Sequence, residues 1–154
     1  VFVRGDSAYC YQEMIKETSG RGVLFTFTAH DGTTSWKDLM QKAYLNWQPW
    51  VYSEREIAKA EVRKVELPTI EVTHFYWTPP WSEKEGAKLV FPILVKRTLE
   101  KEKFEELRRK NEQIKMFQDD GYLKDDPYDY YAVVTNFPLN IATEKLNQSE
   151  AQQK

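Results

Sequence analysis

The sequence predicts a mixed α/β (or α+β) fold, in which a strand–helix–strand unit precedes a β-rich segment and a long charged helix. Three observations support this prediction. Apolar residues make up 41% and aromatic residues 14% of the 154 residues, which is enough for a packed core. Two short apolar runs flank a segment with helical periodicity near the start of the chain. From residue 61 the hydrophobic period changes to two, and a charged helical pattern follows at 98–117.

The first strand is the run Val1-Phe2-Val3, which leads into Arg4-Gly5-Asp6-Ser7. The following segment, 11–18, carries Tyr11, Met14 and Ile15 at helical spacing, and Gly20 or Gly22 is expected to end it. Residues 23–28 then read as a second strand. Because the connection is short and helical, the two strands are predicted to be parallel neighbours with a right-handed crossover.

Asp6 has two interpretations on its local sequence. A carboxylate at the C-terminal end of a buried strand lies where open α/β sheets bind their ligands. Alternatively, Asp6 or Ser7 is simply the N-cap of the following helix. Gly5 indicates either a close approach of another group to the backbone or an unusual backbone dihedral. The local residues leave both interpretations of Asp6 open.

The next segment, 36–46, is predicted to be a helix capped by Thr34 or Ser35. One face of this helix would carry Trp36, Leu39, Met40, Ala43 and Tyr44. Ser53 with Glu56 three residues later forms a capping box and opens a shorter helical piece.

The β-rich segment begins, on its period of two, near residue 61. It includes Val62 and Val65, continues to Trp77 and ends at Pro79-Pro80, after which residues 82–87 form a charged turn. Residues 88–97 give the strongest strand signal, and Pro92 within them indicates an edge strand or a bulge. Two or three antiparallel strands are expected here.

The charged helix at 98–117 has opposite charges four residues apart, including Glu106 and Lys110, which favours a solvated face. The excess of basic residues in and before this helix gives a functional alternative to the solvated face. Residues 95–110 hold seven Lys or Arg against four Glu, a surplus that could contact DNA phosphates. The acidic segment 119–129 lacks the ligand spacing of a calcium loop and is predicted to be a surface loop. Residues 130–135 form a strand returning to the main sheet, and a polar tail follows.

Composition excludes several classes of protein. The formal net charge is −2, so no overall basic field indicates a stand-alone DNA-binding module. Cys10 is the single cysteine and is interpreted as a small buried apolar residue. His30 and His74 lack neighbours at ligand spacing, which disfavours a zinc site.

No apolar run is long enough to span a membrane, and a soluble, cytoplasmic protein is expected. Because the chain starts with Val inside a strand, it reads as a piece of a longer protein.

Two short motifs resemble the DDE transposases of bacterial insertion sequences. The segment Phe2-Val3-Arg4-Gly5-Asp6-Ser7-Ala8-Tyr9 is similar to the strand and turn that carry the second catalytic aspartate of that family. The segment Tyr130-Tyr131-Ala132-Val133-Val134-Thr135-Asn136 is similar to the strand ending in Val-Thr-Asn that closes the family's β-rich insertion. The motifs bracket residues 1–139, and the region between them matches only in general character.

The resemblance implies a partial RNase H-like core that holds Mg²⁺ with two Asp and one Glu and attacks a phosphodiester with water or a 3′-hydroxyl. Only Asp6 matches a catalytic and metal-binding position. The first aspartate would precede Val1. The glutamate would follow the Val-Thr-Asn strand in a Tyr/Arg/Glu/Lys pattern that residues 137–154 lack, so neither Glu144 nor Glu150 is assigned. The parent protein is thus expected to be an enzyme, and this chain alone is not.

The resemblance also implies a division of the chain and a partner. Residues 1–30 would belong to the catalytic core, 31–128 to the insertion, 129–139 to the strand that returns to the core, and 140–154 to the tail. The partner would be DNA at the transposon ends in the bacterial nucleoid, with a homodimer left open. Candidate DNA-contacting residues are Lys96, Arg97, Arg108, Arg109 and, as platforms for a flipped base, Trp77 and Trp81. For each Trp the alternative is a structural role, and for the chain it is a non-catalytic binding module or a degenerate transposase remnant.

Overall fold

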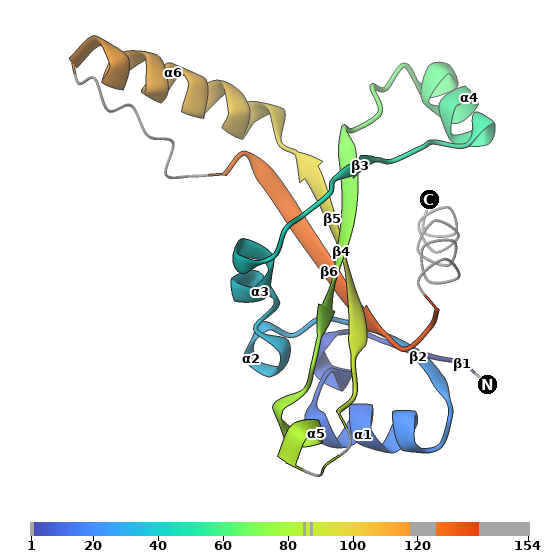
Figure 1. Ribbon diagram of the computed structural model, residues 1–154. Helices are drawn as coiled ribbons and strands as arrows, with labels where there is room; N and C mark the ends of the chain where they lie inside the picture. Colours follow the sequence, from blue (N-terminus) through green and yellow to red (C-terminus); the bar gives the residue numbers. More distant parts are fainter. Residues whose placement is uncertain (1, 85, 87, 118–125, 139–154) are drawn as a thin grey trace. The chain divides into compact units, whose positions relative to one another are not determined.

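A computed structural model describes residues 2–84, 86, 88–117 and 126–138 of the chain (Figure 1). These residues form a mixed α/β structure with six α-helices, one 3₁₀ helix and a six-stranded mixed sheet. In chain order the elements are β1 (Phe2–Gly5), η1 (Ser7–Tyr9), α1 (Gln12–Gly20), β2 (Leu24–Thr28), α2 (Asp31–Thr34), α3 (Trp36–Lys42), β3 (Gln48–Pro49), α4 (Glu54–Arg63), β4 (Ile70–Trp77), α5 (Pro80–Lys84), β5 (Phe91–Leu99), α6 (Lys101–Phe117) and β6 (Tyr128–Thr135).

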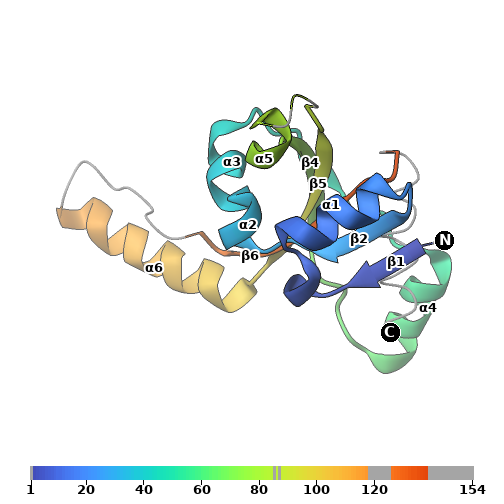
Figure 2. The same cartoon turned by 90° about the horizontal axis from the view of Figure 1, so that it is seen from below.

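The strand order in the sheet is β1-β2-β6-β5-β4-β3. β1 pairs with β2 in parallel, with Phe2 opposite Leu24 and Gly5 opposite Phe27, which confirms the predicted strand–helix–strand unit. β6 pairs with β2 antiparallel, with Thr28 opposite Val133, so the predicted return of this strand to the main sheet is also confirmed. Figure 2 shows β1 and β2 running side by side in the same direction, with α1 connecting them.

The chain divides into two compact units. Unit 1 comprises residues 1–48, 72–95 and 131–154, and unit 2 comprises residues 49–71 and 96–130. Strands β4, β5 and β6 each contain residues of both units. This division differs from the functional boundaries expected from the sequence, which remain predictions about the roles of the segments.

The core of unit 1 is built on the alternation of β2. Phe25 and Phe27 are fully buried, and their rings stack with centroids 4.7 Å apart. Ile15 of α1 is also fully buried, as its place in the predicted helical stripe requires. Phe91 at the start of β5 packs on Phe25 at 5.7 Å, so aromatic rings dominate this core.

Unit 2 has few buried apolar side chains. Ile70 and Leu107 are the buried apolar residues among those of unit 2 whose side chains the structure describes, 49–71, 96–110 and 126–130. Its contacts are mainly polar: the Arg97 guanidinium donates from Nε (3.0 Å) and Nη2 (2.8 Å) to Oε1 of Glu71. The same guanidinium lies 4.3 Å from the ring centroid of Tyr128.

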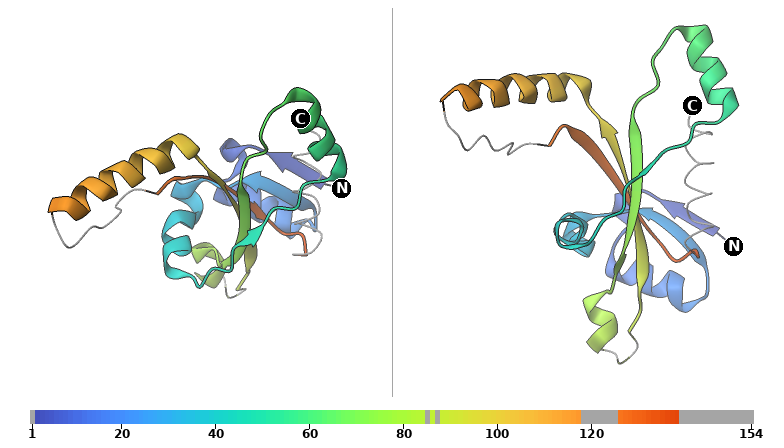
Figure 3. Two further views of the ribbon diagram at one scale, coloured as in Figure 1. Left: turned by 90° about the horizontal axis from the view of Figure 1, so that it is seen from above. Right: turned by 45° about the horizontal axis from the view of Figure 1, so that its top comes forward.

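Several predicted elements differ from the structure. The helix expected at 36–46 is shorter than predicted, since α3 spans Trp36–Lys42. A separate short helix, α2, precedes it, with Ser35 between the two in the left-handed region (φ 52°) (Figure 3). Because α3 ends at Lys42, the predicted apolar face is broken, and Tyr44 is 99% exposed. The period of two around Val62 and Val65 was misleading, since α4 continues to Arg63 and ends with Lys64 left-handed (φ 54°).

Two further corrections concern prolines. Pro80 opens a short helix, α5, where a charged turn was expected, because proline is well suited to a first helical turn. Pro92 lies on an interior strand, since β5 has β6 and β4 as neighbours. Pro92 is the second residue of β5, so the backbone N–H that proline lacks is missing only at the beginning of this strand. The predicted capping box of Ser53 and Glu56 is confirmed, as is the Glu106–Lys110 ion pair at 3.3 Å. The predicted acidic loop at 119–129 is described only from residue 126, and its last two residues, Tyr128 and Asp129, belong to β6 instead. The predicted tail at 140–154 lies outside the described residues.

Candidate functional site

The C-terminal ends of β1 and β2 meet at one edge of the sheet because the two strands are parallel and in register. The residues that follow the last pair, Gly5 and Phe27, are Asp6 and Thr28. The edge at which parallel strands end is where open α/β sheets bind their ligands. Asp6, which the sequence singled out, therefore lies at the edge where a site is expected.

Asp6 is the first residue of a tight turn. Its carboxylate Oδ1 accepts a hydrogen bond from the Ala8 N–H at 2.9 Å, and its carbonyl accepts one from the Tyr9 N–H at 3.1 Å. Asp6 is thus an N-cap, as one interpretation predicted, but it caps the 3₁₀ helix η1 and not the α-helix that follows. That helix, α1, begins after Tyr11 and has no side-chain cap. Among the described residues Oδ2 of Asp6 has no hydrogen-bond partner, and the residue is exposed.

Gly5 is required by the packing of this turn. A Cβ at Gly5 would lie 2.7 Å from Cδ2 and 2.8 Å from Cγ of Tyr9, distances that real Cβ atoms do not adopt. The Tyr9 ring stacks on buried Phe27 at 6.4 Å. The close approach predicted at Gly5 is therefore confirmed, and it fixes the turn against the core. As a consequence, the backbone that carries Asp6 is held by the packing of Tyr9 on Gly5 and Phe27, while the carboxylate itself is exposed.

The turn after β2 is bound to the segment after η1. Thr33 Oγ1 donates to the carbonyl of Cys10 at 2.7 Å, and also lies 3.4 Å from Nδ1 of His30. Burial raises the pKa of the Cys10 thiol, and a hydrogen bond involving the His30 backbone partly opposes this. Cys10 is 1% exposed, so its predicted role as a buried apolar residue is confirmed. These contacts hold the two loops at this edge together.

A hydroxyl pair lies at the same edge. Thr28 Oγ1 is 2.9 Å from the Tyr131 hydroxyl oxygen of β6, and the Tyr131 side chain is 42% exposed. Sequence reasoning missed both residues. The only available signal was their position: Thr28 ends the predicted strand that lies beside Asp6, and Tyr131 is near the start of the returning strand.

The second motif has a structural explanation. Asn136 extends the β2–β6 pairing with its side chain: Oδ1 accepts from the Phe25 N–H at 2.7 Å, and Nδ2 donates to the Val23 carbonyl at 2.8 Å. Thr135 is fully buried and donates from Oγ1 to the Phe25 carbonyl at 2.7 Å. The Val-Thr-Asn ending therefore clamps β6 onto β2, the strand that also supports Tyr9.

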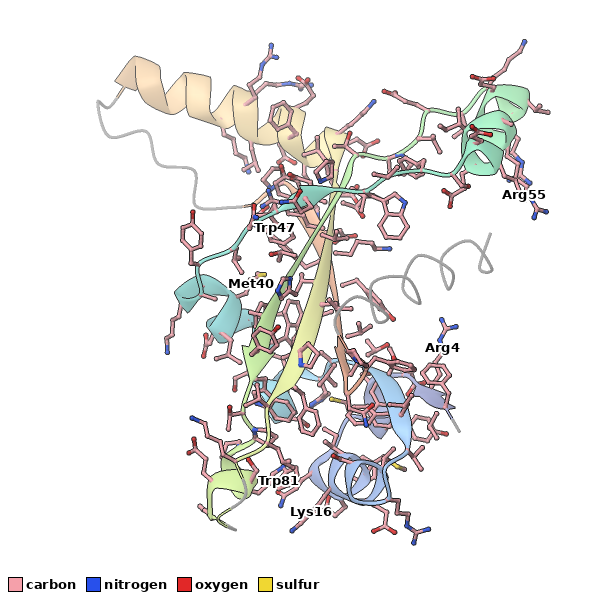
Figure 4. All side chains as sticks on the ribbon, turned by 45° about the vertical axis from the view of Figure 1, so that its right-hand side comes forward. Arg4, Lys16, Met40, Trp47, Arg55 and Trp81 are labelled. Atoms are coloured by element: carbon pink, nitrogen blue, oxygen red, sulfur yellow. The ribbon has the colours of Figure 1, made fainter. Side chains whose placement is uncertain are left out.

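The candidate base platforms occupy different environments. Trp77 is 4% exposed and packs 6.1 Å from Phe91, which agrees with the structural alternative and leaves no ring face for a base. Trp81 of α5 is half-buried, and the Lys16 ammonium of α1 lies 5.5 Å from the centroid of its ring. Figure 4 shows these two side chains next to each other.

The candidate phosphate-binding residues also differ in how accessible their side chains are. Arg97 is bound to Glu71, with their side chains 19% and 28% exposed, and covers Tyr128, so its guanidinium is already committed within unit 2. Lys96 is half-buried on β5. Arg108 and Arg109 are exposed on α6. Of the basic residues predicted to contact DNA, these two are the most accessible.

The described part of the chain contains no group of three His, Cys, Asp or Glu side chains that could hold a metal ion. At the edge after β1, Asp6 supplies one carboxylate, which is the hard oxygen ligand that Mg²⁺ prefers. Asp31 lies after β2, but its Oδ1 accepts from the Lys37 N–H at 3.3 Å at the start of α3. Asp6 is therefore suited to be one ligand of a magnesium site, and further carboxylates are needed to complete that site.

Comparison with known proteins gives no family assignment: neither protein-family models nor curated proteins match this chain. Within the described residues, no helix is long and apolar enough to cross a membrane.

Proposed function

We propose that this chain is part of a DDE transposase and that Asp6 is one of its catalytic, metal-binding aspartates. The observation that carries the proposal is the position of Asp6 directly after β1 of a parallel strand–helix–strand unit. The packing of Tyr9 on Gly5 supports it, because a ligand for a metal ion must be held in place before the ion binds.

The pairing of β6 also supports the proposal. In the RNase H-like core that we propose, the strand ending in Val-Thr-Asn returns from the insertion to the catalytic sheet. The antiparallel pairing of β6 with β2 and the clamp by Thr135 and Asn136 are consistent with that role. The two motifs that carry the resemblance, Phe2 to Tyr9 and Tyr130 to Asn136, thus both contact β2.

The proposed activity is cleavage and joining of DNA at transposon ends. Two Mg²⁺ ions would activate the attacking oxygen and stabilise the leaving oxygen. Asp6 would provide one ligand through Oδ2 while Oδ1 keeps its hydrogen bond to Ala8. Two further carboxylates complete the proposed set, and the residues described here do not supply them.

The proposed DNA-contacting residues are fewer than the sequence predicted. Arg108 and Arg109 on α6 remain candidates for phosphate contacts because both are exposed. Trp81 remains the candidate aromatic platform, since a stacked base would take the place of the Lys16 ammonium on its ring.

The test is Asp6→Asn in the intact protein that carries this sequence. Asparagine caps a helix as well as aspartate does, so the η1 turn should be preserved while the ionised ligand is lost. We expect Mg²⁺-dependent strand cleavage to fall at least about 100-fold, with binding to transposon-end DNA unchanged. The matched control is Asp31→Asn, which changes an exposed carboxylate at the same edge whose Oδ1 accepts a hydrogen bond from the Lys37 N–H. This variant should cleave normally.

A second candidate function is a non-catalytic binding module in which Asp6 acts only as a cap. The hydrogen bond from the Ala8 N–H to the Asp6 carboxylate favours this alternative. In that case Asp6→Asn would bind DNA or another partner like the wild type, and no Mg²⁺-dependent cleavage would depend on it. Unchanged cleavage by Asp6→Asn would exclude the transposase proposal in its present form.

A further inference from the structure

The strand register places Thr28 beside Asp6 on one face of the sheet. Gly5 is opposite Phe27, so Asp6 and Thr28 take the next equivalent positions on the two parallel strands. Asp6 keeps an extended backbone (φ −79°, ψ −172°), and its side chain therefore continues the alternation of β1. That alternation puts Asp6 on the face that carries Arg4, whereas Tyr9 covers Gly5 on the other face. Figure 4 shows Arg4 directed away from the sheet.

Tyr131 reaches Thr28 from the neighbouring strand on the same face. Thr28 is opposite Val133, and Tyr131 precedes Val133 by two residues, so both β6 side chains share the face of Thr28. The 2.9 Å separation of the two hydroxyl oxygens allows either group to donate. If Tyr131 donates, Thr28 accepts, and the Thr28 hydrogen is directed elsewhere.

We propose that the Thr28 hydroxyl donates a hydrogen bond to a non-bridging oxygen of the DNA phosphate that is bound beside Asp6, and that Tyr131 is a positioning residue for it. This inference rests on the proposed function and names a contact within the same site. A hydroxyl is suited to this position, because it binds an anionic oxygen without adding a cation that would compete with metal ions. Thr28 is half-buried, and the hydrogen bond between its Oγ1 and the Tyr131 hydroxyl restrains its rotamer.

Thr26 provides a matched comparison on the same strand and face. Its Oγ1 donates to Oγ1 of Thr135 at 3.3 Å, and it lies two residues farther from the edge. A change at Thr26 therefore alters a threonine of the same β2 face without altering the proposed phosphate contact. Valine is the appropriate replacement at both positions, because it keeps the branched shape that favours a strand.

The experiment measures single-turnover cleavage of transposon-end DNA in Mg²⁺, together with the dissociation constant for that DNA, in the intact protein. We expect Thr28→Val to lower the cleavage rate about 10- to 100-fold, the range for one lost hydrogen bond to a charged group. The dissociation constant and the thermal unfolding midpoint should change little. Thr26→Val should cleave at the wild-type rate.

Tyr131→Phe tests the positioning role, because it removes only the hydroxyl. It should slow cleavage less than Thr28→Val does, and the double variant should be no slower than Thr28→Val alone, since Tyr131 acts through Thr28. Additive losses in the double variant would overturn the positioning role.

The outcomes separate this inference from the proposed function. A wild-type cleavage rate for Thr28→Val, in a protein that Asp6→Asn inactivates, would overturn the Thr28 contact and leave the transposase proposal standing. Equal losses for Thr28→Val and Thr26→Val would also overturn it, because they would indicate a general effect on β2. Cleavage that persists in Asp6→Asn would instead remove the proposed function on which the contact depends.

Discussion

The two compact units of this chain differ in the interactions that stabilise each of them internally. In unit 1, stacked and tilted aromatic rings around Phe25 and Phe27 exclude water from one face of β2. In unit 2, the contacts that the structure describes are mainly between charged and aromatic side chains, centred on Arg97. Burial of apolar area is the larger and less salt-dependent source of stability. The candidate site belongs to unit 1, where the turn that carries Asp6 is packed against a rigid core.

The largest expected effect is at the centre of unit 1. Phe27→Ala should lower the free energy of unfolding by about 3 to 5 kcal/mol, because it leaves a cavity beneath Tyr9 and beside Phe25. Urea denaturation followed by tryptophan fluorescence measures this change. The exposed Phe104 (44%), also changed to Ala, is the control and should cost far less. Similar losses for the two variants would contradict the assignment of the core to the face of β2.

A smaller effect is expected from the charged centre of unit 2. Arg97→Met should lower the free energy of unfolding by about 1 to 3 kcal/mol, because Glu71 loses a half-buried partner and Tyr128 its cation. Hydrogen exchange of the amides around residues 97 and 128 should increase.

The comparison for Arg97 is an exposed ion pair in the same unit. Lys101 pairs with Glu66, but their side chains are 61% and 77% exposed. Lys101→Met should therefore change the free energy of unfolding by no more than about 0.5 kcal/mol. An equal effect at Arg97 and Lys101 would show that burial does not distinguish the two pairs.

The last expected effect is visible only at high pH. Burial and the hydrogen bond to the Asp126 carboxylate raise the pKa of Tyr130 to about 12, although Arg97 lowers it in part. Because the folded-state pKa lies above the ordinary value of 10.0, the neutral form contributes stability that is fully present below pH 10. That contribution should be lost as the pH rises through 12. Ultraviolet absorbance titration of the wild type against Tyr130→Phe should identify a late-titrating phenol. Its absence would contradict the partial burial of Tyr130 together with its hydrogen bond to Asp126.

Local sequence was sufficient for the elements that carry the candidate site. The apolar alternation of 23–28, the helical spacing before it and the short connection predicted a parallel β1–α1–β2 unit, and each of these signals acts over a few residues. Local signals failed where two patterns overlapped. Val62 and Val65 fit a period of two, but the capping box at Ser53 began a helix that runs through Arg63. Pro92 was misplaced because sequence gives the position of a proline in a strand but not the neighbours of that strand.

The sequence by itself determined that Asp6 follows a strand, that Gly5 allows a close approach to the backbone, and that residues 130–135 form a strand. It could do so because hydrophobic period and turn chemistry are properties of adjacent residues. The predicted burial of the first strand was wrong, because β1 lies at the edge of the sheet and its residues are exposed or half-buried. Only the tertiary structure decided that Tyr9 makes the close approach at Gly5, that Asn136 clamps β6 onto β2, and that Tyr131 meets Thr28. Those contacts join residues about a hundred positions apart in the last two cases, and strand register, which no local pattern specifies, brings them together.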